Sequence, residues 1–66
     1  MKRFYEVYTT EPHFTDKWGN PVFLIGTFDS LAIADSWRWD EYWYLDTYIK
    51  EVVMDETGVS SYRLDM

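Results

Sequence analysis

The sequence contains no cysteine, a single histidine and no long apolar segment. Without cysteine the chain forms no disulfide and offers zinc no thiolate ligand, and one histidine is too few for a His-rich metal site. No uninterrupted apolar run exceeds four residues, far below the roughly 20 that a membrane helix needs, and no signal-peptide pattern opens the chain. We therefore expect a soluble, cytoplasmic protein that uses no metal or cofactor.

Basic residues are also scarce. Six lysines and arginines stand against twelve acids, so the formal net charge is −6. Direct binding to nucleic acid or to an anionic membrane requires clustered basic residues, and here they are scattered singly among acids, so we expect neither. A basic surface on a larger protein is the natural counterpart of this charge. The alternative is that the surplus of acids only keeps a small protein soluble.

What the chain has in abundance is apolar and aromatic side chains. Of its 66 residues, 47% are hydrophobic and 21% are aromatic, which is far above the content of disordered acidic segments. The length allows one hydrophobic core and no more. We therefore expect a single globular domain over residues 1–66.

The pattern predicts two strands, a helix and two further strands. The first strand covers 3–10, whose residues on both sides suit a pleated surface, and Pro12 ends it. The second covers 22–28 and contains Gly26, which indicates either a bulge or a close approach to the backbone. A loop joins them over 13–21. Either Asp29 or Ser30 can cap a helix that runs from 30 to about 40 or 41. The pattern leaves the end of the helix open, with 39–46 as a frayed last turn, a loop or a continuation.

The last two strands are predicted over 47–55 and 59–64, joined by a hairpin loop at 55–58 in which Gly58 takes a positive φ. The fold class is therefore α+β, a two-layer ββαββ domain with an antiparallel sheet of about four strands and one helix packed on one face. On the helix we expect Ile33, Ala34 and Trp37 to face the sheet, and Asp35 and Arg38 to face away. The predicted core also includes one ring from the last strand and Tyr5, Val7, Phe23, Ile25, Ile49 and Val53.

The densest feature is the segment 37–48, in which half of the residues are aromatic and three more are acids. One helix face and one strand face cannot hide six rings, so we expect some of them to be exposed, where Trp and Tyr favour binding. Acids beside exposed rings suit a target rich in Arg or Lys. The predicted partner-binding residues here are Asp35, Trp39, Asp40, Glu41, Tyr42, Trp43, Tyr44 and Asp46. Alternatively, these rings wrap the helix end and complete a thin core.

A second aromatic and acidic group, Phe14, Asp16 and Trp18, lies in the loop 13–21. We count Asp16 and Trp18 among the candidate partner-binding residues, while the alternative is that the rings of this loop cap the open end of the sheet. His13 is alone and is expected to be an ordinary loop residue.

The chain contains no nucleophile elbow, phosphate-binding loop or zinc motif. Its adjacent acids, as at Asp40 and Glu41, do not form the facing pair that glycosidases use, and so small a sheet has no room for a pocket of the usual size. We therefore expect a protein that is not an enzyme.

Two functions agree with these observations. In the first, the chain is an inhibitor that docks on a basic groove, where acids stand in for phosphates and exposed rings for bases; the acids are Asp29, Asp35, Asp40, Glu41, Asp46, Asp55 and Glu56. In size and charge balance the chain resembles the small acidic proteins that phages encode against host defence, such as anti-restriction and anti-CRISPR proteins. In the second, the exposed aromatics mediate homo-oligomerisation, as in a homodimer of a structural or assembly protein.

Overall fold

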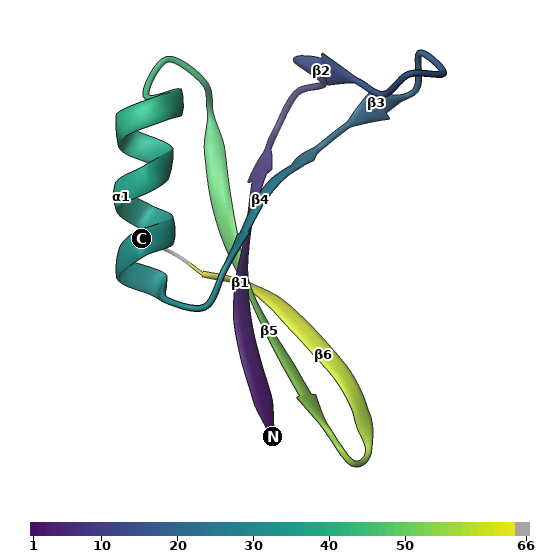
Figure 1. Cartoon of the computed structure of the whole chain (residues 1–66), viewed down its shortest axis with the longest axis vertical. Coiled ribbons are helices and arrows are strands. Elements are labelled where there is room, and N and C mark those ends of the chain that lie inside the picture. Colours follow the sequence, from purple (N-terminus) through teal and green to yellow (C-terminus); the bar gives the residue numbers. More distant parts are fainter. Residues whose placement is uncertain (65–66) are drawn as a thin grey trace.

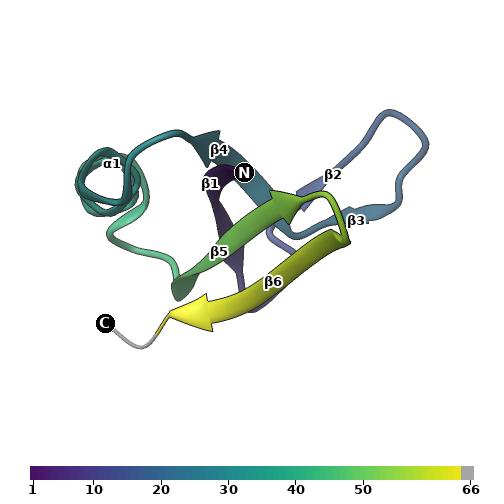
Figure 2. The ribbon, with the colours of Figure 1, turned by 90° about the horizontal axis from the view of Figure 1, so that it is seen from below.

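A computed structural model describes residues 1–64 of the chain. Four strands form an antiparallel sheet in the order β4-β1-β5-β6, and β2 and β3 pair separately. The single helix, α1, packs against β1, β4 and β5 on one face of the sheet (Figures 1 and 2). The elements are β1 (Lys2–Thr9), β2 (Phe14–Thr15), β3 (Pro21–Val22), β4 (Leu24–Phe28), α1 (Leu31–Tyr42), β5 (Thr47–Asp55) and β6 (Gly58–Leu64). The predicted α+β class is confirmed, and the predicted ββαββ order roughly matches. A short β2–β3 hairpin is added, and β3 takes Val22, the first residue of the predicted second strand.

The register of the sheet follows the predicted alternation. Val7 on β1 lies opposite Ile49 on β5, and both side chains are fully covered. Together with Ala34 of α1 they form the centre of the core. Six partly buried hydrophobic residues pack around this centre: Tyr5, Ile25, Phe28, Leu31, Trp37 and Leu64.

Several predicted core residues lie elsewhere. The exposed fraction is 60% for Ile33 and 40% for Phe23, so both predictions are wrong. The predicted ring of the last strand, Tyr62, is half exposed, and Leu64 packs against the core in its place. Val53 is only partly buried and lies outside the core cluster.

The helix is rotated relative to the prediction. Ser30 caps it as expected, accepting a hydrogen bond from the amide of Ile33 at 3.4 Å. The stripe that faces the sheet contains Ala34 and Arg38, both buried, whereas Ile33 faces solvent. A long arginine can cover apolar surface with its stem while its head reaches a polar partner. The prediction that Arg38 faces away from the sheet, which rested on its charge, is therefore wrong.

Both features predicted for Gly26, a bulge in the strand and a close approach to the backbone, are present. Val7 pairs with Gly26 but Tyr8 pairs with Leu24, so Ile25 is an extra residue at a bulge in β4. A Cβ on Gly26 would lie 2.9 Å from a ring carbon of Phe28 and 2.9 Å from one of Trp37. The close approach of the helix to the sheet therefore requires glycine here.

The β5–β6 turn also agrees with the sequence. Asp55 pairs with Gly58 across a two-residue loop, and Gly58 has a φ of +139°. The side chain of Asp55 accepts hydrogen bonds from the amide of Thr57 at 2.8 Å and from its hydroxyl at 2.6 Å. These bonds hold the pKa of the Asp55 carboxyl below its ordinary value.

Candidate protein-binding surface

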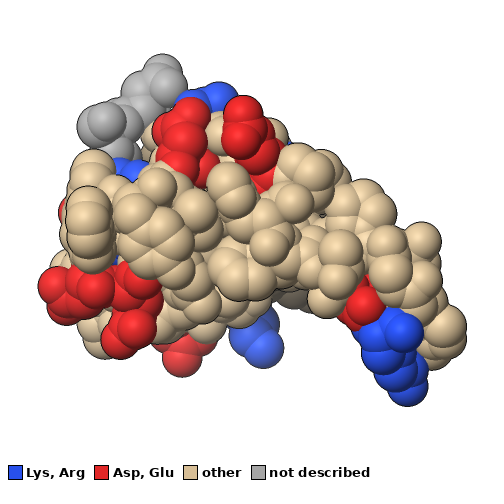
Figure 3. All heavy atoms as spheres, turned by 90° about the horizontal axis from the view of Figure 1, so that it is seen from above, with Lys and Arg blue, Asp and Glu red and all other residues tan. Residues whose placement is uncertain are grey.

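Three large aromatic side chains are exposed where the helix ends. The exposed fraction is 57% for Trp39, 69% for Trp43 and 61% for Tyr44. The acids Asp40, Glu41 and Asp46 of the same segment are also exposed. We call this the helix-end surface, and define it by Trp39, Asp40, Glu41, Trp43, Tyr44 and Asp46. Viewed from the end of the molecule where the helix stops, acidic groups border a broad uncharged surface on the side of the helix (Figure 3).

Tyr42 explains why its neighbours face outward. It is partly buried, with its ring centroid 5.1 Å from that of Trp37 and 5.7 Å from that of Phe14 on β2. The helix ends there, and the amide of Leu45 turns back to the carbonyl of Tyr42 at 3.0 Å. Tyr42 thus completes an aromatic cluster, as the structural alternative expected for some of these rings, while Trp43 and Tyr44 project into solvent.

The acids of the helix-end surface stand at the unfavourable end of the helix. The last turn of α1 contains Asp40 and Glu41 and no basic residue, and the first turn contains no acid. A helix C-terminus carries a partial negative charge, so acids there are destabilising by about 0.3–1 kcal/mol each. Residues that oppose the local stability rules in this way are concentrated at functional sites.

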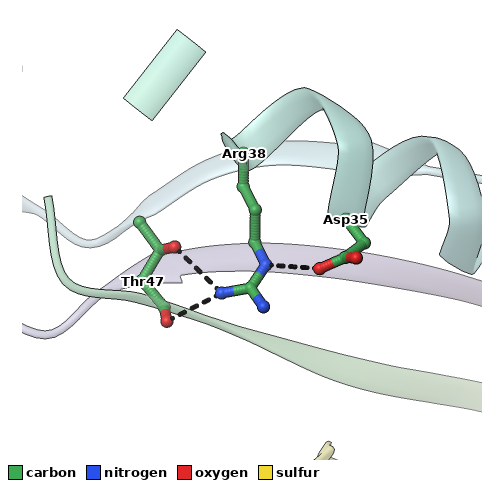
Figure 4. Close-up of polar contacts among 3 residues, drawn as sticks. All are labelled: Asp35, Arg38 and Thr47. Atoms are coloured by element: carbon green, nitrogen blue, oxygen red, sulfur yellow. Dashed lines mark hydrogen bonds and ion pairs between the residues drawn. The ribbon is translucent and has the colours of Figure 1, made fainter. Parts of the chain in front are cut away.

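The only basic residue between positions 29 and 46 is turned inward. The guanidinium of Arg38 donates to Asp35 at 2.9 Å and to both the carbonyl and the hydroxyl of Thr47, at 3.1 and 3.2 Å (Figure 4). Arg38 is only 8% exposed, so it leaves the acids of the helix-end surface largely uncompensated. Asp35 is bound in this ion pair and does not belong to that surface.

Asp46 has a structural as well as a surface position. Its backbone carbonyl accepts the amide of Thr10 at 3.0 Å, and its carboxylate accepts the hydroxyl of Thr10 at 3.2 Å. The start of β5 is thereby tied to the end of β1. The side chain stays exposed, and its charge remains part of the helix-end surface.

Asp16 and Trp18 of the second predicted group do not join the helix-end surface. Asp16 is partly buried and accepts the amides of Trp18 and Asn20 at 2.9 and 3.0 Å, so its carboxylate closes the β2–β3 turn. Trp18 is 74% exposed, and Lys17 lies 4.5 Å from its ring centroid. This hairpin projects away from the helix (Figure 1). Phe14 connects it to the helix end through Tyr42.

The structure adds a depression that the sequence did not reveal. A shallow hollow of about 350 Å³ lies on the outer side of α1 and borders the helix-end surface at Asp40. Its lining residues are Ala32, Ile33, Ser36, Trp37 and Asp40. The spacing of Ile33 and Trp37 predicted a core position for both residues, which is confirmed for Trp37 and wrong for Ile33.

The described part of the chain also bears on the expectations for metal ligands, His13 and membrane helices. No three His, Cys, Asp or Glu side chains there are placed to hold a metal ion. His13 is exposed, with Nε2 at 3.9 Å from a carboxylate oxygen of Glu11. Within residues 1–64 no helix has the length and hydropathy to cross a membrane.

The fold and this surface define a small α+β domain with an acidic and aromatic surface at the end of its helix. No family model matches the chain, and neither a curated protein nor a solved structure matches it.

Proposed function

We propose that this protein is a small cytoplasmic binding module that docks its helix-end surface on a basic surface of a larger protein. The observation that carries the proposal is the coincidence, at the C-terminal end of α1, of exposed rings with acids that have no basic partner within residues 1–64. The acids lower the stability of the helix, and the exposed rings add nothing to the core. A partner that offers Arg or Lys would cover the rings and neutralise the acids at the same time.

The module acts through binding rather than catalysis, as an inhibitor. Carboxylates displayed beside aromatic rings can occupy a groove that otherwise receives phosphates and bases, because they present the same charge and the same flat stacking surfaces. The exposed acids Asp29, Asp40, Glu41 and Asp46 all lie on or next to α1. The size and acidity shared with phage proteins directed against host defence agree with this role.

The test is a charge reversal at the helix end. Asp40→Lys combined with Glu41→Lys should abolish capture of the partner from lysate of the source cell, while the helix signal and melting temperature stay unchanged or rise. The rise follows from placing positive charge at the helix C-terminus. With the captured protein in hand, its affinity should fall steeply as NaCl increases, and nucleic acid should compete with the domain for binding.

The matched control is Glu11→Lys combined with Thr15→Lys and Asn20→Lys. It changes the net charge by the same amount at exposed positions outside the helix-end surface, and should leave capture intact. If the helix-end variant and the control retain the partner equally, the proposed surface is wrong.

A further inference from the structure

The two edges of the sheet differ in how well they are protected against pairing with another strand. Unpaired edges template further pairing unless bulges, prolines, lysines or covering elements prevent it. Strand β4 is short, contains the bulge at Ile25 and packs against α1. Strand β6 pairs with β5 over seven residues without a register shift. It contains no proline and no lysine, and its one charged residue is Arg63.

The register identifies the free backbone groups of β6. A two-residue hairpin closes on a hydrogen-bonded pair, here Asp55 with Gly58, and such pairs alternate along an antiparallel ladder. Gly58, Ser60, Tyr62 and Leu64 therefore direct their backbone groups toward β5. The backbone groups of Val59, Ser61 and Arg63 point away from the sheet, along an edge that is solvent-exposed over 58–63 (Figure 2).

A second copy of this chain fits the edge when the two strands run antiparallel about Ser61, the midpoint of β6. All three outward residues are then used, since Ser61 faces Ser61 of the second copy and Val59 faces Arg63. Like charges directly opposite are destabilising, and this register keeps the two arginines apart. It also brings each Arg63 to the end of the other strand where the acidic turn of Asp55 and Glu56 lies, which gives charge complementarity.

We propose that β6 pairs with β6 of a second copy, which joins two four-stranded sheets into one continuous sheet. The contact also covers Val59, which is 65% exposed in the single chain. The helix packs on β1, β4 and β5, so the helix-end surface is not used in this contact. Each dimer would then carry two such surfaces. The inference does not depend on the proposed function, because it concerns the chain alone.

The experiment measures mass and amide exchange for the purified protein. Light scattering should give twice the 8.0 kDa mass of the chain at high micromolar concentration and the single mass on dilution. In the dimer the amides of Val59, Ser61 and Arg63 should exchange at least about tenfold more slowly than in the monomer. A single mass at all concentrations, with these amides unprotected, would overturn the proposal.

Two pairs of variants test the register. Ser61→Pro removes an outward N–H without removing a bond to β5, and should give a folded monomer, whereas Ser61→Ala should remain a dimer. Since the native chain has no cysteine, Ser61→Cys places one thiol at the symmetry axis, and it should cross-link rapidly on oxidation. Val59→Cys should not, because its two copies lie about 13 Å apart along the strands. Equal cross-linking of the two cysteine variants would contradict this arrangement even if Ser61→Pro failed to fold.

Discussion

Gly26 shows how strongly a single residue can determine the packing of this small domain. Its missing side chain lets the rings of Trp37 and Phe28 approach the backbone of β4. Their ring centroids lie 4.9 Å apart, and Trp37 continues the aromatic contacts to Tyr42. So few residues are fully buried that these partly buried rings account for much of the covered apolar surface.

A double-mutant cycle tests this packing. Gly26→Ala should lower the free energy of unfolding by about 1–3 kcal/mol, because the new methyl group displaces two rings. Trp37→Ala should lower it by about 3 kcal/mol. In the Trp37→Ala background the Gly26→Ala change should have a smaller effect, because one of the two clashes is gone. Urea unfolding of the four proteins measures the coupling, and strictly additive losses would contradict a direct contact.

At the scale of elements, Arg38 connects α1 to β5. The ion pair with Asp35 lies within the helix, whereas the two hydrogen bonds to Thr47 cross to the strand. Contacts of this kind compensate for the small apolar area of the helix, whose buried residues are Ala34 and Arg38. The side chain that the sequence placed on the outer face is therefore a main attachment of the helix to the sheet.

Arg38→Ala should lower the free energy of unfolding by about 2 kcal/mol, because both Asp35 and Thr47 lose their hydrogen-bond donor. Arg3 provides the control. Its Nε lies 3.0 Å from a carboxylate oxygen of Glu51, but its side chain is 50% exposed. Arg3→Ala should lower the free energy by less than about 1 kcal/mol. Equal losses in thermal or urea unfolding would show that the contacts with Thr47 add nothing.

The β5–β6 hairpin should respond to acid through Asp55. Its pKa is lowered because the charged carboxylate accepts the hydroxyl and the amide of Thr57. A depressed pKa in the folded state means that the stabilisation is complete above the ordinary carboxyl pKa of about 4 and is lost as the pH falls through the lower, folded value. NMR should show the Thr57 amide shift titrating with this low pKa, and no such titration in Asp55→Asn. A Thr57 titration that persisted in Asp55→Asn would assign it to another acid.

At the scale of the whole molecule, the acidic and basic residues are unevenly distributed between the two sides of the sheet. The segment 29–46 contains five acids and only Arg38, which is buried. On the sheet face opposite α1, Lys50 lies 5.0 Å from the ring centroid of Tyr8, and Arg63 lies 4.4 Å from that of Tyr48. The two tyrosines stack on each other with centroids 5.5 Å apart. The acidic surplus behind the net charge of −6 thus lies mainly on the helix side of the sheet and less on the opposite face.

The sheet face opposite α1 contains a buried residue although no helix covers that face. Val52 is only 4% exposed although no helix packs on its side of the sheet. Burial and the hydrogen bond that Tyr8 donates to Glu6 raise the pKa of the Tyr8 phenol above its ordinary value. Side chains of the same sheet face therefore cover Val52 without a second layer.

The sequence by itself determined the class and order of the elements, because period-two alternation, the Ser30 cap and the Asp55–Gly58 turn are local signals that act within a few residues. It also indicated that rings between 39 and 44 would be exposed, as Trp39, Trp43 and Tyr44 are, since two narrow faces cannot hide so many. Their role in binding stays a prediction. Only the tertiary structure decided that Arg38 faces inward and Ile33 outward, that Tyr42 joins the aromatic cluster and that β6 is the unprotected edge. These features depend on the rotation of α1 about its axis against the sheet and on which strand forms the edge of the sheet. Both are determined by contacts between residues that are distant in the sequence.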